Sequence, residues 1–83
     1  MRLLYFAWVK EKTGIAAEEI GIPARVATIA DLIAWLKTRG PEFANAFAAP
    51  EVVRAAIDHA HVRHDAPVRD AREIAFFPPV TGG

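Results

Sequence analysis

A single amphipathic helix is the feature that most limits how this chain can fold, and it lies at residues 28–41, TIADLIAWLKTRGP. Thr28 can cap the first turn, Asp31 stands at the capping-box position, and Gly40 with Pro41 ends the helix. Four apolar residues recur with the helical spacing i, i+3, i+4 and i+7: Ile29, Leu32, Ile33 and Leu36. This apolar face must pack on another layer, and the flanking sequence indicates that the layer is a sheet.

The sequence before this helix indicates two strands. Residues 2–10, RLLYFAWVK, are short and rich in aromatic residues, and residues 15–23, IAAEEIGIP, follow a turn at Thr13-Gly14 and stop at Pro23. We expect the two strands to form a hairpin. Alternation along residues 2–10 gives an inner set, Leu3, Tyr5, Ala7 and Val9, and an outer set, Leu4, Phe6, Trp8 and Lys10, since a charge in a buried row is costly.

The sequence after the helix indicates a short second helix and more strands. Residues 41–49, PEFANAFAA, favour the helix, whereas VVRAAID and HVRH favour short strands and DAPVRDAR a loop. The last strand is EIAFF, residues 73–77. We therefore expect one α+β domain over residues 1–83, with a mixed sheet of four to five strands if the last strand lies beside the first, one main helix on one face, and an extended tail at 78–83.

Composition excludes several classes of partner and site. Ten basic and ten acidic residues give no net charge, so nothing indicates binding to nucleic acid or to an anionic membrane surface. The chain has no cysteine, which excludes disulfides and thiolate chemistry. Its apolar runs are shorter than the roughly 18 residues of a membrane span, and its start lacks a signal-peptide cleavage site. We expect a cytoplasmic, unprocessed protein.

The outer face of the predicted sheet is a candidate binding surface. If Ile74 and Phe76 join the core, Phe77 falls on the face that carries the outer set of the first strand. Leu4, Phe6, Trp8 and Phe77 would then form one apolar patch, with Lys10 at its rim. Such patches usually mark a surface for a partner.

The last six residues combine a stiff segment with a thin one. Pro78 and Pro79 cannot continue a sheet ladder and favour an extended exit, and Val80 and Thr81 lead to Gly82 and Gly83, which carry no side chain. Two terminal glycines alone fit a frayed end equally well. The stiff exit favours a tail that delivers its carboxylate at a distance. A carboxylate needs activation, and since the chain has no phosphate-binding glycine loop, a partner must supply it.

Other candidate sites have simpler interpretations. His59, His61 and His64, with Asp65 adjacent, could be proposed as metal ligands, but solvated surface histidines are the more common case, and we expect no metal. Glu18 and Glu19 fit a solvated strand edge rather than an acid/base pair. Trp8 and Trp35 fit packing in the core or at an interface.

Three segments resemble a known family: FAWVKEKTG near the start, TIADLIAWL on the helix and, most specifically, IAFFPPVTGG at the end. They are similar to the small subunit of molybdopterin synthase, the MoaD type of ubiquitin-like sulfur carrier. The resemblance implies a ubiquitin-like β-grasp fold with a flexible Gly-Gly tail. It also implies that an adenylating enzyme (MoeB type) uses ATP on the terminal glycine, that a thiocarboxylate follows, and that sulfur passes to cyclic pyranopterin monophosphate in the large subunit (MoaE type).

Carried onto this chain, the resemblance makes Gly83 the sulfur carrier and Gly82 the thin position before it. Phe6, Lys10 and Phe77 match positions that the family uses against its partners, and the assembly implied is a heterotetramer without a permanently bound cofactor. The family often has an Asn where this chain has Asp58. Two alternatives stay open: a sulfur carrier or protein modifier of another pathway, such as thiamine synthesis, and an interaction module with an inert tail.

Overall fold

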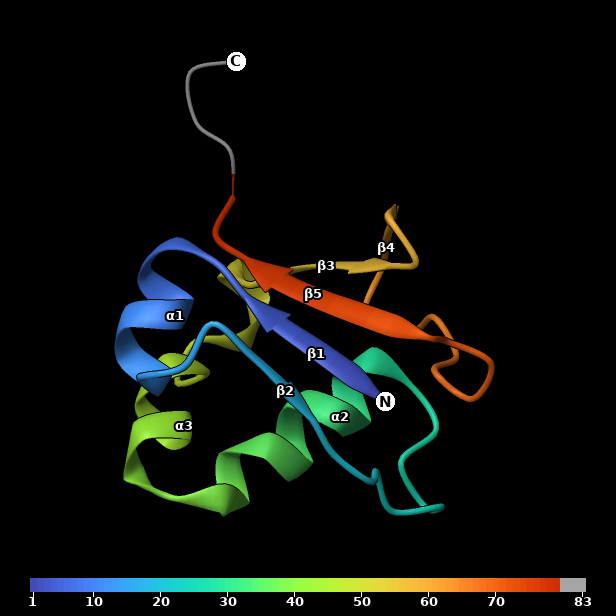
Figure 1. The fold of residues 1–83 in the computed structure, drawn as a ribbon, viewed down its shortest axis with the longest axis horizontal. Helices are drawn as coiled ribbons and strands as arrows, with labels where there is room; N and C mark the ends of the chain where they lie inside the picture. Colours follow the sequence, from blue (N-terminus) through green and yellow to red (C-terminus); the bar gives the residue numbers. More distant parts are fainter. Residues whose placement is uncertain (80–83) are drawn as a thin grey trace.

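The computed structural model describes residues 1–79, in which helices lie against one face of a five-stranded mixed sheet (Figure 1). The strands are β1 (Arg2–Tyr5), β2 (Ala17–Glu19), β3 (Arg54–Ile57), β4 (Ala60–Val62) and β5 (Glu73–Phe77), in the order β2-β1-β5-β3-β4. The helices are α1 (Ala7–Thr13), α2 (Ile29–Leu36) and α3 (Pro41–Ala46), with 3₁₀ turns η1 (Lys37–Arg39) and η2 (Pro50–Val52). No helix in this part of the chain is long and apolar enough to cross a bilayer.

The two central strands come from opposite ends of the chain. β1 and β5 run parallel, with Leu3 beside Ile74 and Tyr5 beside Phe76, whereas the other strand pairs are antiparallel. The predicted pairing of the last strand with the first, and hence the mixed sheet, is confirmed. These four side chains are buried on the helix side of the sheet. Leu4, Ala75 and Phe77 alternate with them and therefore lie on the outer face.

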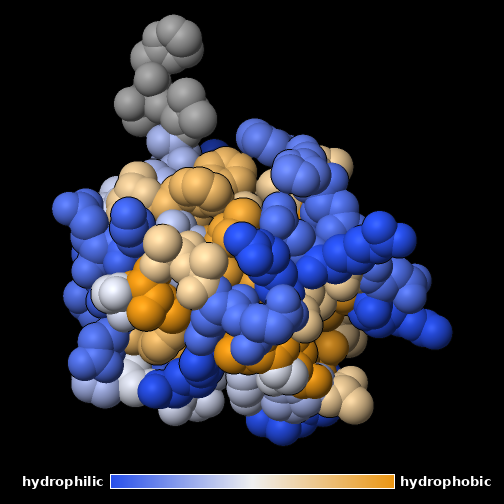
Figure 2. Space-filling model, in the orientation of Figure 1, coloured by the Kyte–Doolittle hydropathy of each residue, from blue (hydrophilic) through white to orange (hydrophobic). Residues whose placement is uncertain are grey.

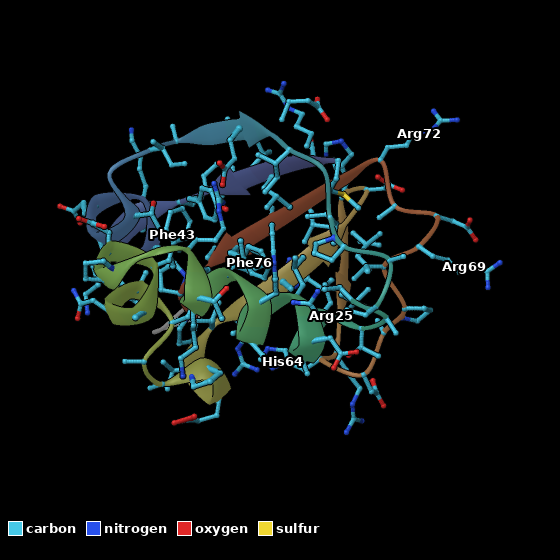
Figure 3. All side chains as sticks on the ribbon, turned by 90° about the horizontal axis from the view of Figure 1, so that it is seen from below. Arg25, Phe43, His64, Arg69, Arg72 and Phe76 are labelled. Atoms are coloured by element: carbon cyan, nitrogen blue, oxygen red, sulfur yellow. The ribbon has the colours of Figure 1, made fainter. Side chains whose placement is uncertain are left out.

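The core lies between the sheet and the helices. The apolar face of α2 is buried as predicted, with Ile29, Leu32, Ile33 and Leu36 at most 2% exposed. An aromatic cluster fills the end near α3: the Tyr5 and Phe76 rings stack with centroids 6.2 Å apart, and Phe47 meets Phe76 edge-on at 5.2 Å. Figure 3 shows Phe43 and Phe76 pointing into this interior from α3 and β5. Edge-on and offset aromatic pairs add to the burial of apolar area.

The predicted strand at residues 2–10 is wrong beyond Tyr5. β1 ends there, Ala7 takes a left-handed φ of 51°, and α1 occupies residues 7–13 until Gly14, at φ 84°, caps it. The buried positions of α1 are Val9 and Thr13. A spacing of four fits both strand alternation and one helical turn, so the apolar pattern alone could not separate the two. β2 still pairs antiparallel with β1, through a helical connection instead of a tight hairpin.

The predicted helices after residue 28 and the last strand agree closely with the structure, whereas β2 covers only residues 17–19 of the strand predicted at 15–23. Residues 28–41 contain α2 and η1, residues 41–49 contain α3, and β5 has the predicted bounds. β3 and β4 are shorter than the predicted strands and meet at a turn where Asp58 and His59 have φ 47° and 74°. Two central positive φ values are typical of tight hairpin turns, and Asp and Asn tolerate them better than most residues.

Candidate functional site

β5 provides a rigid base for the tail. It is hydrogen-bonded between β1 and β3, and Phe76, its penultimate residue, is fully buried. Pro78 and Pro79 follow directly and are partly buried as the chain leaves the sheet (Figure 1). Val80, Thr81, Gly82 and Gly83, predicted to contact the partner and to carry the reaction, lie outside the described residues.

The outer face beside this exit is partly apolar. Phe6 donates its backbone N–H to the carbonyl of Phe76, which continues the parallel register and places Phe6 next to Phe77. Phe6 is 48% exposed, and Phe77 and Leu4 are partly exposed. These three predicted partner residues thus lie close together, Leu4 on β1, Phe77 on β5 and Phe6 directly after β1. Figure 2 shows hydrophobic surface near the exit, with hydrophilic side chains beside it.

Trp8 and Lys10 do not belong to this strand surface, contrary to the prediction. Both lie on α1, because the alternation of β1 ends before Ala7. Trp8 packs partly against the core, and the ammonium of Lys12 lies 5.1 Å from the centre of its ring. Lys10 is exposed on α1, where its carbonyl accepts the N–H of Gly14. The predicted patch therefore reduces to the residues of β1 and β5 and the Phe6 position between β1 and α1.

A shallow cleft lies on the β3 side of β5, away from β1, and the sequence pattern did not predict it. Its lining contains three basic side chains, Arg54, His61 and Arg63, together with Phe77 and Pro79. The rings of His61 and Phe77 are 5.1 Å apart. Strand alternation could have placed Arg54, His61 and Arg63 on the same face as Phe77. That step requires the register of β3 against β5, which the sequence does not show.

The three histidines of the HAHVRH segment have separate surroundings. His64 contacts the carbonyl of Val53 through Nε2 at 2.7 Å, His61 packs on Phe77, and the ring of His59 lies 3.8 Å from a carboxylate oxygen of Glu73. Within residues 1–79 no group of three or more His, Cys, Asp or Glu side chains is arranged to hold a metal ion.

Glu18 is not the solvated strand-edge residue that the sequence suggested. Its side chain is 14% exposed, and Arg39 donates two hydrogen bonds to its carboxylate, at 2.6 and 2.9 Å. The hydroxyl of Tyr5 donates a third, at 2.7 Å. These donors, Arg39 first, hold the pKa of Glu18 below its usual value, while burial and then the Glu18 carboxylate raise the pKa of Tyr5. Glu19, at 71% exposure, does fit the prediction.

The side chain of Asp58 has a structural role in the turn between β3 and β4. One oxygen of its carboxylate accepts the backbone N–H groups of Arg72 and Glu73, at 3.0 and 2.9 Å. It thereby fixes the start of β5. An Asn side chain could accept the same bonds through its amide oxygen.

The comparisons with known proteins find relatives that match nearly the whole chain. The ThiS family model matches residues 3–83. The molybdopterin synthase sulfur carrier subunit of Escherichia coli (strain K12) is 35% identical over 83 residues, which is 100% of this chain and 99% of that protein.

Solved structures show the same fold. A protein described as subunit 1 of a molybdopterin converting factor, from Pyrococcus furiosus, matches with a TM-score of 0.72 and 27% identity over 95% of each chain. SAMP1 from Haloferax volcanii matches with a TM-score of 0.71 and 21% identity, over 100% of this chain and 98% of that one, which supports the fold alone. The expected ubiquitin-like β-grasp fold is confirmed, and the chain belongs to the ThiS family of sulfur carriers, in its molybdopterin synthase small-subunit (MoaD) branch.

Proposed function

We propose that this chain carries sulfur as the small subunit of molybdopterin synthase. A MoeB-type enzyme adenylates the carboxylate of Gly83 with ATP, sulfur replaces the adenylate to give a thiocarboxylate, and the tail enters a MoaE-type large subunit. There the sulfur passes to cyclic pyranopterin monophosphate. The chain acts as the sulfur donor within this sulfurtransferase and has no catalytic site of its own.

The observation that carries the proposal is the end-to-end match to the sulfur carrier subunit of Escherichia coli. The family match also extends to residue 83 and so includes Gly82 and Gly83. The build of the chain is consistent with this role. β5 is anchored on both sides, Pro78 and Pro79 end its ladder, and two residues without side chains complete the tail.

The partner surfaces follow from the same proposal. Leu4, Phe6 and Phe77 contact the large subunit beside the tail exit, while Lys10, exposed on α1, pairs with an acidic group at the rim of the interface with the activating enzyme. Apolar contacts of this kind supply affinity, whereas rim charges mainly affect the rate of association.

The test compares the wild-type chain with two tail variants, one extended by an alanine after Gly83 and one lacking Gly83. An added residue places the carboxylate about 3.5 Å further along an extended chain, and misplacement by even 1 Å can cost on the order of a hundredfold in rate. We expect both variants to keep the wild-type melting temperature and to lose adenylation or sulfur transfer by at least about a hundredfold. Intact-mass measurement of the activated wild type should show one oxygen replaced by sulfur.

Three results would contradict the proposal. Transfer at the wild-type rate by either variant would show that the terminal carboxylate is not the reactive group. A wild-type chain that is thiocarboxylated but gives sulfur only to a thiamine-pathway acceptor, or that becomes attached to protein amines, would show that it works as the sulfur carrier or protein modifier of another pathway. If the wild type and both variants are neither adenylated nor thiocarboxylated, the remaining alternative is an interaction module whose tail has no chemical role.

A further inference from the structure

Three side chains form a row across the sheet at the end from which the tail leaves. Arg54 of β3 pairs with Phe77 of β5. Ala55 pairs with Val62, the last residue of β4, so the next residue, Arg63, follows on the same side as Arg54, and the two arginines line the same hollows. All three lie on the outer face, two residues from the pairs Ala56–Ala75 and Ala56–His61. The row is therefore one aromatic ring followed by two guanidinium groups.

The two arginines have no internal counter-charge in the described part of the chain. Both are exposed, and no carboxylate of residues 1–79 lies within 4.0 Å of either guanidinium. Glu51 lines the neighbouring hollow with Arg54 and Arg63 without forming an ion pair with them. Like charges placed directly opposite each other on paired strands are destabilising. The two guanidinium groups therefore repel each other without an ion pair within residues 1–79 to offset the repulsion, and departures from local rules of this kind are expected at functional or strained sites.

The cleft beside the row joins the two charges to an apolar wall. Arg54, His61 and Arg63 line it together with Phe77 and Pro79, the last described residue. Gly83 is the fourth residue after Pro79, a reach of at most about 14 Å. Any protein that takes this tail into a pocket must bring its own surface against the residues at the base of the tail.

We propose that this cleft docks an acidic segment of the protein that receives the tail. Two carboxylates of that segment bind Arg54 and Arg63, and an apolar side chain packs against Phe77 and Pro79. Guanidinium groups bind carboxylates in bidentate geometry, which fixes the orientation of the partner as well as attracting it. The inference rests on the proposed function, because that function provides a receiving protein. It adds a charged contact to the apolar contacts proposed for the same face.

The experiment measures binding of full-length variants to the large subunit of molybdopterin synthase. Arg54→Gln with Arg63→Gln removes both charges of the cleft. Arg69→Gln with Arg72→Gln is the matched control, because these exposed arginines project from the loop before β5, at the other end of that strand (Figure 3), and likewise have no ion pair within residues 1–79. We expect the cleft variant to raise the dissociation constant about tenfold or more and to weaken its dependence on salt. The control should stay within about twofold of wild type. Replacing an acidic residue of the large subunit by arginine, together with Arg54→Glu, should restore binding.

The outcomes separate this inference from the proposed function. If the cleft variant binds the large subunit with wild-type affinity and the same salt dependence, the inference is overturned and the proposed function stands. A wild-type chain that neither binds the large subunit nor transfers sulfur would overturn both. Nε–Hε NMR signals of Arg54 and Arg63 that shift when residues 80–83 are deleted would show that the chain's own carboxylate fills the cleft. Signals that shift with inorganic phosphate, but not with chloride at equal ionic strength, would show a small-anion site; either result overturns the inference.

Discussion

Glu18 links three parts of the chain through one carboxylate. It lies on β2, accepts the hydroxyl of Tyr5 from β1, and accepts two N–H groups of Arg39 from η1. The guanidinium of Arg39 also lies over the ring of Phe43, 4.5 Å from its centre. Because Arg39 is 21 residues away, the sequence around Glu18 could show only two adjacent carboxylates at a strand edge. Only the tertiary fold brings the donors Tyr5 and Arg39 to Glu18, and this is why Glu18 is bonded and mostly buried while Glu19 is exposed.

We predict that Glu18→Gln lowers the free energy of unfolding at neutral pH by about 1–2 kcal/mol, because hydrogen bonds to a charged acceptor are the stronger ones. The pKa of Glu18 is lowered in the folded state, so its stabilisation is complete above the ordinary value of 4.5 and is lost as the pH falls through the lower folded pKa. Urea unfolding of both proteins from neutral pH to below pH 4.5 should show the difference shrinking in that acid range.

Glu19→Gln is the control for this prediction. Glu19 is 71% exposed and pairs only with the N-terminal ammonium, at 2.8 Å, among residues 1–79. Its replacement should change stability by less than about 0.5 kcal/mol. Equal effects of the two substitutions at neutral pH, or a difference that does not shrink in acid, would show that the three-residue network contributes no more than a surface charge.

At the level of elements, α2 and α1 show why one helix was predicted and the other was not. In α2, Thr28 and Asp31 cap each other, and the next two N–H groups, of Ile29 and Ala30, bond to carbonyls in residues 64–66. Every orphan donor of its first turn is satisfied, half of them by residues that the sequence itself identifies.

In α1 the corresponding signals are absent. Phe6 occupies the N-cap position without a side-chain hydrogen bond, and the first turn has no acidic residue. Its buried pair, Val9 and Thr13, has a spacing that a strand shares. The outer-face predictions failed for Trp8 and Lys10 for this reason, whereas Phe77 on the correctly predicted β5 is where alternation placed it.

The capping box of α2 gives the prediction at this scale. Thr28→Ala removes the side-chain acceptor of the Asp31 N–H, at 3.2 Å, and should lower the free energy of unfolding by about 1 kcal/mol. Thr38→Ala is the control: its hydroxyl bonds to the carbonyl of Trp35 at an exposed site outside the cap, and its loss should cost less than about 0.5 kcal/mol. Chemical denaturation measures both. A Thr28→Ala variant as stable as the Thr38→Ala variant would mean that the contacts with residues 64–66 alone fix the start of the helix.

As a whole, the molecule uses the two faces of one sheet for different purposes. The inner face of β1 and β5 is closed by α2, α3 and an aromatic cluster, so its side chains determine stability. No helix of residues 1–79 covers the outer face (Figure 1), which presents the apolar residues and the basic cleft on either side of the tail exit. β5 contributes to both faces through adjacent phenylalanines: Phe76 lies in the core and Phe77 on the outer face.

Phe76 and Phe77 therefore allow the division to be tested with two substitutions of the same kind. Phe76 is fully buried and contacts Tyr5 and Phe47, so Phe76→Ala should lower the free energy of unfolding by about 3–5 kcal/mol, a large part of the total for a small domain. Phe77 is partly exposed beside Phe6 and His61, so Phe77→Ala should leave the fold and most of its stability intact. It should instead weaken binding to the large subunit by about 2 kcal/mol or more, as expected for an aromatic anchor that becomes buried in an interface. Thermal unfolding and calorimetric titration, carried out on both variants, separate the two effects. Unfolding of the Phe77→Ala chain, or its binding with wild-type affinity, would mean that the outer face of β5 belongs to the core or lies outside the interface.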